Sequence, residues 1–268
     1  MLNEMDSKRI DGKKISIEIG QRLHAEIRAK SLHPSLGILC IGEDAISMSY
    51  KNGKEKFALT NGFKVVTERF TDEVSTEFII EKLNKMQSEH DGVILQLPLP
   101  EKFKNDTDKI LQTLRPEKDV DGSNSENHNF VPPVVLAFQQ ALDIVSVELE
   151  TIKIAVVGLG AVVGMPIADY CKNAGAEVIE VGLGEHDKIK EADVVVSGVG
   201  KPNVIKADTI KVGSILIDYG YSYVDGKCTG DFEKECYEKC KYYTPVPGCM
   251  GPLDVAFLFQ NVLKSAQD

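Results

Sequence analysis

The chain has 268 residues, of which 43 % are hydrophobic and 27 % charged, so it is long enough for two lobes that each bury a core. Its formal net charge of −10 argues against nucleic acid or an anionic membrane surface as a partner. No stretch approaches the ~18 apolar residues that a membrane span needs, and residues 1–10 are too polar for a signal peptide. These properties are typical of a cytoplasmic enzyme.

The cysteines give no sign of a disulfide framework or of a metal centre. They are scattered and form no Cys-x-x-Cys pair, which predicts free thiols in a reducing compartment. Two of them are four residues apart and could bind a metal, but the five histidines supply no matching cluster, so we predict no metal site. The six cysteines are Cys40, Cys171, Cys228, Cys236, Cys240 and Cys249.

The first half alternates helical and strand patterns, which predicts an α/β fold with parallel sheets and helices on both faces. The third strand pattern is almost wholly apolar, as expected of a central parallel strand, and the prolines of Leu97–Pro100 cannot continue its ladder. A polar loop then leads to Pro132-Pro133 and a further helix, near which we place the lobe boundary. The expected elements are helices 12–30, 45–60, 75–87 and 133–147, and strands 36–41, 64–69 and 92–96.

The second half opens with a buried strand, a Gly-x-Gly-x-x-x-Gly turn at Gly158–Gly164, and a helix that ends near Asn173. This order predicts a phosphate cradle in a Rossmann-like lobe, because glycines let the backbone approach a pyrophosphate and a helix N-terminus offers free N–H groups. The final amphipathic helix is expected to pack back on the first lobe. The expected elements are strands 152–157, 177–181, 194–197, 214–218 and 242–244, and helix 253–266.

The adenosine end of this predicted nucleotide site is sparsely equipped. A standard NAD site has Asp or Glu at the end of the second strand to hold the ribose hydroxyls, but that position is Gly182 here. An NADP site usually has an arginine for the 2′-phosphate. No arginine follows Arg115, so only lysines such as Lys188 or Lys190 could serve. The cofactor is therefore expected to be NAD or NADP, with NAD slightly favoured.

Polar residues of the first half suggest a second site. Ser47, Tyr50 and Lys54 share one face of a predicted helix, at positions i, i+3 and i+7. The third strand delivers Gln96 at its carboxyl end, where α/β sheets place their ligands, and the turn Asp119–Gly122 follows soon afterwards. Taken alone, the helix face would be interpreted as a solvated stripe with an incidental tyrosine.

In combination, these pieces resemble the bifunctional methylenetetrahydrofolate dehydrogenase/cyclohydrolase (FolD) family. The order and spacing of the matching segments hold over nearly the whole chain, from about Arg9 to Leu263. The segments are Ser47-x-x-Tyr50-x-x-x-Lys54, Asp91-Gly92-Val93-Ile94-Leu95-Gln96-Leu97-Pro98-Leu99-Pro100, Lys118-Asp119-Val120-Asp121-Gly122, Gly200-Lys201-Pro202 and Thr244-Pro245-Val246-Pro247-Gly248-Cys249-Met250-Gly251-Pro252.

The resemblance implies an enzyme of one-carbon metabolism that oxidises 5,10-methylenetetrahydrofolate with NAD or NADP. It then hydrolyses the 5,10-methenyl product to 10-formyltetrahydrofolate. By motif, Lys54 would be the catalytic lysine, Gln96 its partner, Tyr50 the residue against the folate ring system and Asp121 the pterin anchor. Further substrate-binding residues would be Ser47, Pro247, Gly248, Gly251 and Pro252, and the nucleotide would lie against Gly158, Gly160, Ala161, Val162, Gly164, Val199 and Gly200.

The resemblance also implies an architecture. Residues 1–134 and 253–268 would form the folate-binding lobe, and residues 135–252 the nucleotide lobe, with the active site in the cleft between them. Family members usually pair through the nucleotide lobe, which implies a homodimer.

The residue types suit this chemistry. Water must add to a delocalised methenyl cation while losing a proton, and a lysine beside such a cation has a lowered pKa, so it can be neutral near pH 7. Gln96 can hydrogen-bond this amine without adding charge. The Asp121 carboxylate can accept two pterin N–H groups through charge-assisted bonds.

The chain departs from the family pattern at positions that mostly serve the nucleotide. The glycine turn carries Leu159-Gly160 where the family usually has Arg-Ser, and the second strand ends in Gly182-Leu183-Gly184-Glu185 in place of a His-Ser segment. Two alternatives therefore stay open: a cyclohydrolase with weak or absent dehydrogenase activity, and a non-catalytic folate-binding paralogue. Retention of Lys54 and Gln96 argues against the second alternative.

Overall fold

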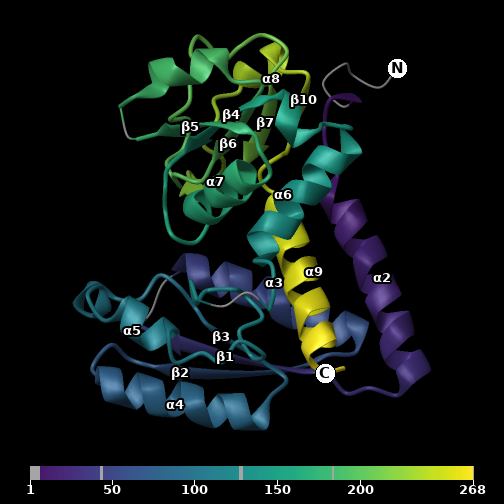
Figure 1. Ribbon diagram of the computed structural model, residues 1–268, viewed down its shortest axis with the longest axis vertical. Helices are drawn as coiled ribbons and strands as arrows, with labels where there is room; N and C mark the ends of the chain where they lie inside the picture. The colour runs from purple at the N-terminus through teal and green to yellow at the C-terminus, as the bar shows by residue number, and fades with distance from the viewer. Residues whose placement is uncertain (1–6, 43–44, 127–128, 183, 268) are drawn as a thin grey trace. The chain divides into compact units, whose positions relative to one another are not determined.

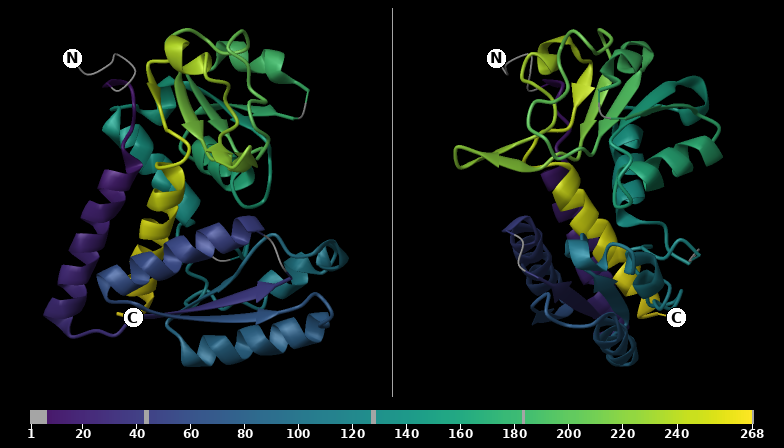
Figure 2. Two further views of the ribbon diagram at one scale, coloured as in Figure 1. Left: turned by 180° about the vertical axis from the view of Figure 1, so that it is seen from behind. Right: turned by 90° about the vertical axis from the view of Figure 1, so that its left-hand side faces the viewer.

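The computed structural model describes residues 7–42, 45–126, 129–182 and 184–267, and for residues 45–52 it describes the main chain alone. The chain forms two compact units (Figures 1 and 2). The three-stranded unit comprises Ser16–Pro133 and Val255–Asp268, and the five-stranded unit comprises the residues up to Ile15 together with Val134–Asp254. Each is an α/β unit with a parallel sheet, as the sequence predicts.

The three-stranded unit is built around a parallel sheet with strand order β2-β1-β3. Its central strand is buried along nearly its whole length, and α3 and α4 cover opposite faces of the sheet (Figures 1 and 2). The strands are β1 (Ser35–Ile41), β2 (Lys64–Phe70) and β3 (Gly92–Leu95). The helices are α2 (Gly12–Lys30), α3 (Ala45–Asn61), α4 (Thr76–Glu89), η1 (Glu101–Phe103), α5 (Thr107–Leu111) and α9 (Met250–Ser265), of which α2 and α9 begin in the other unit.

Helix α4 illustrates how local sequence forms this unit. The Ser75 hydroxyl caps its N-terminus by accepting the main-chain N–H of Phe78 at 3.2 Å. Ile79, Leu83 and Met86 then recur at helical spacing, and all three are fully buried against β1 and β3. Burial of side chains of this size stabilises a fold by roughly 1.5–3 kcal/mol each.

The final helix completes the same unit. Phe259 of α9 stacks on Phe57 of α3 with ring centroids 5.3 Å apart, and it also contacts Phe63. Arg22 of α2 donates to the Gln260 amide oxygen at 2.7 Å. This is the return to the first lobe that the amphipathic pattern of the helix predicts.

The five-stranded unit has a parallel sheet with strand order β10-β7-β6-β4-β5. After β4 the chain adds β5 on one side and then crosses to form β6 on the other, so the carboxyl ends of β4 and β6 flank a topological switch point. The strands are β4 (Lys153–Val157), β5 (Glu177–Val181), β6 (Val194–Ser197), β7 (Ile215–Asp218), β10 (Tyr242–Tyr243) and the antiparallel hairpin β8 (Ser222–Val224) and β9 (Lys227–Thr229). The helices are α6 (Pro133–Ile144), η2 (Leu149–Thr151), α7 (Gly164–Asn173), η3 (His186–Glu191) and α8 (Cys236–Lys239).

The start of the described chain belongs to the five-stranded unit, whereas the sequence prediction placed residues 1–15 in the first lobe. The main-chain nitrogen of Ile10 donates to the Tyr243 carbonyl at 2.9 Å, and that of Tyr243 donates to the Lys8 carbonyl at 3.0 Å. These bonds pair the segment with the short edge strand β10, because that edge otherwise leaves main-chain groups without partners.

The predicted long elements are confirmed, with boundaries that shift by at most three residues. The final helix begins at Met250, so Gly251 and Pro252 fall inside its first turn. The sequence interpretation did not include the short helices η1, α5, η2, η3 and α8 or the β8–β9 hairpin. Within the described part of the chain, no helix is long and apolar enough to cross a membrane.

Candidate functional site

Lys54 and Gln96, the predicted catalytic lysine and its partner, are in contact. Lys54 is only 8 % exposed, and its Nζ donates to Gln96 Oε1 at 3.0 Å. Gln96 follows β3 directly, and its main-chain nitrogen donates to the Leu39 carbonyl of β1 at 2.8 Å. Its Nε2 donates to the Leu97 carbonyl at 3.0 Å. Both ends of the amide are therefore used, which keeps the acceptor oxygen directed at the lysine.

The predicted pterin anchor, Asp121, lies in a turn that the neighbouring Asp119 organises. Asp119 is fully buried, and its carboxylate accepts the main-chain N–H groups of Ser123 at 3.2 Å and Asn124 at 2.8 Å. Burial raises the pKa of Asp121, while the positive charge of Lys54 opposes this rise. Because such an effect requires proximity, the Asp121 carboxylate lies near the Lys54 ammonium.

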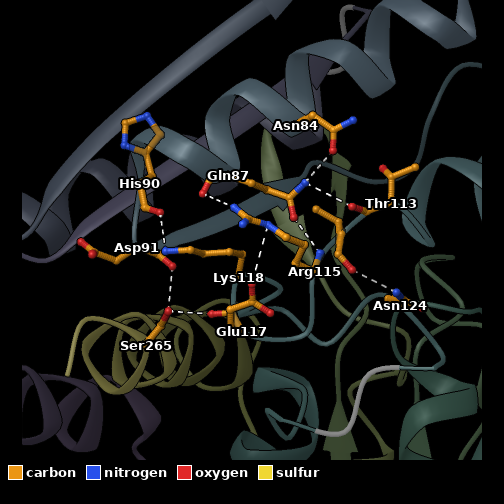
Figure 3. Close-up of polar contacts among 11 residues, drawn as sticks. Asn84, Gln87, His90, Asp91, Thr113, Arg115, Glu117, Lys118, Asn124 and Ser265 are labelled. Atoms are coloured by element: carbon orange, nitrogen blue, oxygen red, sulfur yellow. Dashed lines mark hydrogen bonds and ion pairs between the residues drawn. The ribbon is translucent and has the colours of Figure 1, made fainter. Parts of the chain in front are cut away.

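A network of side-chain to main-chain bonds holds segment 113–124, which carries Asp121 (Figure 3). On one side, the buried Gln87 of α4 accepts the main-chain N–H of Arg115 at 2.6 Å. On the other, Ser265 of α9 shares its hydroxyl proton between two carbonyl oxygens. The further bonds join Gln87 Nε2 to Thr113 O (3.1 Å), Lys118 Nζ to His90 O (3.0 Å), Asn124 Nδ2 to Leu114 O (3.1 Å) and Ser265 Oγ to Asp91 O (2.7 Å) and Glu117 O (2.8 Å).

Two predicted residues, Ser47 and Tyr50, fall on the stretch whose main chain alone is described. Both belong to α3, the helix that carries Lys54. Their side chains lie outside the described part of the structure, so their roles against the folate stay predictions.

The remaining predicted substrate-binding residues lie in the five-stranded unit. The Val246-Pro247 peptide bond is cis, and Gly248 has a φ of 118°, which favours glycine. The Gly248 carbonyl accepts the main-chain N–H of Lys13 at 3.1 Å. The adjacent Cys249 is fully buried, and this burial raises the pKa of its thiol to about 12, which favours the thiol over the nucleophilic thiolate. Gly251 and Pro252 form the start of α9.

The glycine turn between β4 and α7 has the geometry of a dinucleotide cradle. A Cβ on Gly164 would lie 2.0 Å from the Gly158 carbonyl oxygen, so the first turn of α7 can approach the strand end only with glycine there. A Cβ on Gly160 would meet nothing within 4 Å, so the turn is open on that side. Val162 is 52 % exposed. The turn therefore leaves room for a pyrophosphate against main-chain N–H groups.

The other predicted nucleotide residues lie across the switch point. The main-chain nitrogen of Gly198 donates to the Val157 carbonyl at 3.1 Å, which continues the pairing of β6 with β4. A Cβ on Gly158 would lie 2.9 Å from Val199. The two glycine-containing segments, 158–164 and 198–200, thus meet at the carboxyl ends of β4 and β6, where open α/β sheets bind ligands.

A pair of buried carboxylates holds the second of these segments. Asp231 is fully buried and accepts the Ser197 hydroxyl at 2.7 Å. It also accepts three consecutive main-chain N–H groups, from Val199 (2.8 Å), Gly200 (3.2 Å) and Lys201 (2.9 Å). Asp218, which is 2 % exposed, in turn accepts the main-chain N–H of Asp231 at 3.0 Å. Burial and the neighbouring Asp231 raise the pKa of Asp218 to about 7.

Sequence reasoning missed both acids and also missed Glu185, which lies beside the end of β5. The signal that was present is an aspartate at the last position of the buried strand β7 and a second one in Gly230-Asp231-Phe232. A carboxylate enclosed by apolar residues is costly unless main-chain donors or cations satisfy it, so such an aspartate indicates a structural or functional partner.

No group of three potential metal-binding side chains occurs among the residues that the structure describes. Cys236 and Cys240 are both buried, and their thiols donate to the carbonyls of Ile205 and Tyr237 at 3.5 and 3.4 Å. Burial raises the pKa of Cys236 to about 12 and that of Cys240 to about 11, which favours the thiol over the thiolate that metals bind.

Two protein-family models match the chain in tandem. The model for the catalytic domain of tetrahydrofolate dehydrogenase/cyclohydrolase matches residues 10–121, and the model for its NAD(P)-binding domain matches residues 132–268. The first range contains Lys54, Gln96 and Asp121, and the second contains the glycine turn and the Asp218–Asp231 pair.

Individual proteins agree with these models over nearly their full length. The chain is 36 % identical to the bifunctional protein FolD of Sulfurovum, across 96 % of this chain and 98 % of that protein. Its structure is similar to the crystal structure of FolD from Campylobacter jejuni, with a TM-score of 0.89, 28 % identity and coverage of 97 % and 98 %. It is also similar to FolD of Trypanosoma brucei complexed with NADP and an inhibitor, with a TM-score of 0.88, 27 % identity and coverage of 96 % of each chain.

Proposed function

We propose that this chain, which belongs to the tetrahydrofolate dehydrogenase/cyclohydrolase family, catalyses both reactions for which the family is named. It oxidises 5,10-methylenetetrahydrofolate to the 5,10-methenyl form with NAD or NADP, and it hydrolyses that product to 10-formyltetrahydrofolate. The observation that carries the proposal is the buried contact between Lys54 and Gln96, 3.0 Å long, at a strand end that also presents Asp121.

Lys54 is the proton acceptor of the hydrolysis. A water molecule attacks the methenyl carbon and loses a proton, and an amine held close by a neutral partner can accept that proton without an opposing ion pair. The formyl group remains on N10, so the bond from its carbon to N5 breaks and N5 takes up a proton. Gln96 supports this step because its oxygen holds the Lys54 Nζ in place while its own amide is fixed by the Leu97 carbonyl.

Asp121 binds the pterin by accepting its N–H donors. A carboxylate serves this purpose in its ionised form. Burial raises the pKa of Asp121, and the positive charge of Lys54 opposes this rise. The network around Gln87 and Ser265 keeps the segment that carries Asp121 in place. Asp121 is therefore a binding residue, whereas Lys54 accepts the proton of the attacking water.

The five-stranded unit fits the dinucleotide that the oxidation requires. The main chain of Gly158–Gly164 and the N-terminus of α7 would hold the pyrophosphate, and Val199 and Gly200 would line the opposite side of the switch point. A nicotinamide held there would supply the hydride acceptor for oxidation of the methylene carbon of the folate. The open side of the turn at Gly160 and the close approach at Gly164 are the features of this chain that favour such binding.

The proposal is tested by an absorbance time course of methylenetetrahydrofolate with the purified protein, run in parallel with NAD and NADP. We expect the methenyl product to appear with at least one nucleotide and then to decay to the formyl product. Hydrolysis of added methenyltetrahydrofolate without any oxidation would contradict the dehydrogenase half. Absence of both reactions would contradict the proposal as a whole.

We further propose a cytoplasmic homodimer. Six cysteines without a disulfide suit a reducing compartment, and the exposed Tyr223 and Val224 on the β8–β9 hairpin offer apolar surface to a second copy. Light scattering coupled to size-exclusion chromatography tests the assembly, and a mass near 29.5 kDa, that of one chain, would contradict it.

A further inference from the structure

The end of β5 carries a carboxylate that its sequence position does not reveal. Glu185 lies four residues beyond the strand, but its Oε2 accepts the main-chain N–H of Gly182 at 3.1 Å, and its own main-chain nitrogen donates to the Gly182 carbonyl at 3.3 Å. These two bonds bring the carboxylate back to the first residue after Val181, the last residue of the strand.

This position borders the glycine turn. Val181 pairs with Val157 in the register of β5 with β4, and the main-chain nitrogen of Gly158 donates to the Val181 carbonyl at 3.1 Å. The strands lie side by side in the sheet (Figure 1). In dinucleotide folds, an acidic residue about 20 residues beyond the glycine motif, at the end of the second strand, accepts the hydroxyls of the adenosine ribose. Glu185 places a carboxylate at that point.

The carboxylate retains capacity for a ligand. An ionised carboxylate offers about four acceptor sites. Glu185 accepts the Gly182 N–H and also the Nζ of Lys188, which lies 2.7 Å from Oε1. The side chain is 48 % exposed. Both partners lower the pKa of Glu185, so the group is an anion at neutral pH.

The surroundings do not favour a second anion. The turn position after Gly158 is Leu159, an apolar residue that is 37 % exposed, and no arginine follows Arg115 in the sequence. A 2′-phosphate beside Glu185 would face a like charge, and Lys188, whose side chain is 52 % exposed, already forms an ion pair with that glutamate. A free 2′-hydroxyl meets no such repulsion.

From this geometry we propose that the nucleotide site selects NAD over NADP, and that Glu185 is the specificity-determining residue, which accepts the ribose hydroxyls. The inference rests on the dehydrogenase half of the proposed function, and it names the cofactor that this half uses. Lys188 is a positioning residue, because its ammonium holds the carboxylate against the end of β5.

The test is calorimetric titration of NAD and NADP into the wild type, Glu185→Gln and the charge-matched control Asp187→Asn. Asp187 lies in the first turn of η3, the short helix that Glu185 precedes, and pairs with Lys190 instead. We expect the wild type to bind NAD at least tenfold more tightly than NADP. Glu185→Gln keeps the size of the side chain but removes its charge, so it should reduce this ratio about tenfold. Asp187→Asn should leave the ratio unchanged.

A wild type that binds NADP as tightly as NAD, or a ratio that Glu185→Gln does not change, would overturn the inference. Lys188→Met is an independent test. If this variant lost NADP affinity but kept NAD affinity, Lys188 would bind the 2′-phosphate, and this result would also contradict the inference. Urea unfolding of the same samples reports whether each variant is folded. NAD-selective binding without methylenetetrahydrofolate oxidation would count against the proposed function and leave the specificity inference standing.

Discussion

The main-chain nitrogen of Asp231 lies 3.0 Å from the carboxylate of Asp218, so one buried acid positions the other. Asp231 then uses its own carboxylate to hold three consecutive amides of the loop after β6. That loop borders the topological switch point of the five-stranded sheet. The nucleotide side of this protein therefore depends on two acids, neither of which is expected to touch the nucleotide.

Replacing Asp231 with asparagine should weaken nucleotide binding more than folate chemistry. The amide keeps one acceptor oxygen but presents an NH₂ group to main-chain donors, which leaves buried N–H groups unsatisfied at a cost of about 1–3 kcal/mol each. We expect a loss of stability of about 2–4 kcal/mol in urea unfolding and weaker NAD and NADP binding in titration. The hydrolysis of methenyltetrahydrofolate, which uses Lys54 in the other unit, should persist. An equal loss of nucleotide binding and of hydrolysis would contradict this separation of roles between the two units.

The stability of the protein should fall as the pH rises from about 4 to about 7. The pKa of Asp218 is raised from 3.8 to about 7, so in this window the folded state keeps a proton that the unfolded state releases. The folded state binds more protons, and the free energy of unfolding decreases with pH by an amount on the order of 4 kcal/mol at most. Urea unfolding at pH 5 and pH 8 measures this difference in the free energy of unfolding. A variant that lacks the Asp218 carboxyl group separates its contribution from that of other titrating groups.

The matched variant for this pH dependence is Asp218→Asn, which cannot titrate. It should be less stable than the wild type at pH 5, and its stability should change less between pH 5 and pH 8. The exposed Asp187→Asn serves as the control, because Asp187 is 93 % exposed and should leave the wild-type slope unchanged. A slope that is the same in wild type and Asp218→Asn would show that other groups determine it.

Much of the architecture follows from local patterns. Helix α4 has a capping serine and apolar residues at helical spacing, and β4 contains the apolar run Ile154–Val157 before a glycine turn. Both elements are therefore recognisable without tertiary information. The short helices η1 and α5 are not, because five or fewer residues supply no period and their burial depends on the packed core around Phe103 and Ile110.

The sequence predicts those parts of the site in which a motif contains the side chain that acts in the reaction. Lys54 and Gln96 stand 42 positions apart, and their contact follows from the placement of α3 beside the end of β3. The Asp218–Asp231 pair and the folded-back Glu185 could not be predicted in this way. Their roles arise from hydrogen bonds to main-chain amides, and any residue can supply those amides, so the sequence contains no matching partner to find.

Replacing Gly164 with alanine should disrupt the phosphate cradle. The new Cβ would lie 2.0 Å from the Gly158 carbonyl oxygen, a main-chain atom that can move only if the turn opens. We expect a loss of stability of about 1–3 kcal/mol, as for other overpacked sites, and loss of measurable nucleotide binding. Gly160→Ala, whose Cβ would meet no atom within 4 Å, should retain wild-type stability. Equal stabilities of the two variants would contradict the close approach.

Replacing Lys54 with methionine should abolish hydrolysis while preserving the fold. Methionine has a similar length and suits a position that is 8 % exposed, but it removes the base and leaves the Gln96 oxygen without its amine donor. Loss of a general base reduces rates by roughly 10²–10⁴-fold. The exposed Lys56→Met, on the same helix, is the matched control and should hydrolyse methenyltetrahydrofolate at the wild-type rate. Folate binding should survive in Lys54→Met, because Asp121 still accepts the pterin N–H groups. Hydrolysis that continued at the wild-type rate would assign the base to another residue.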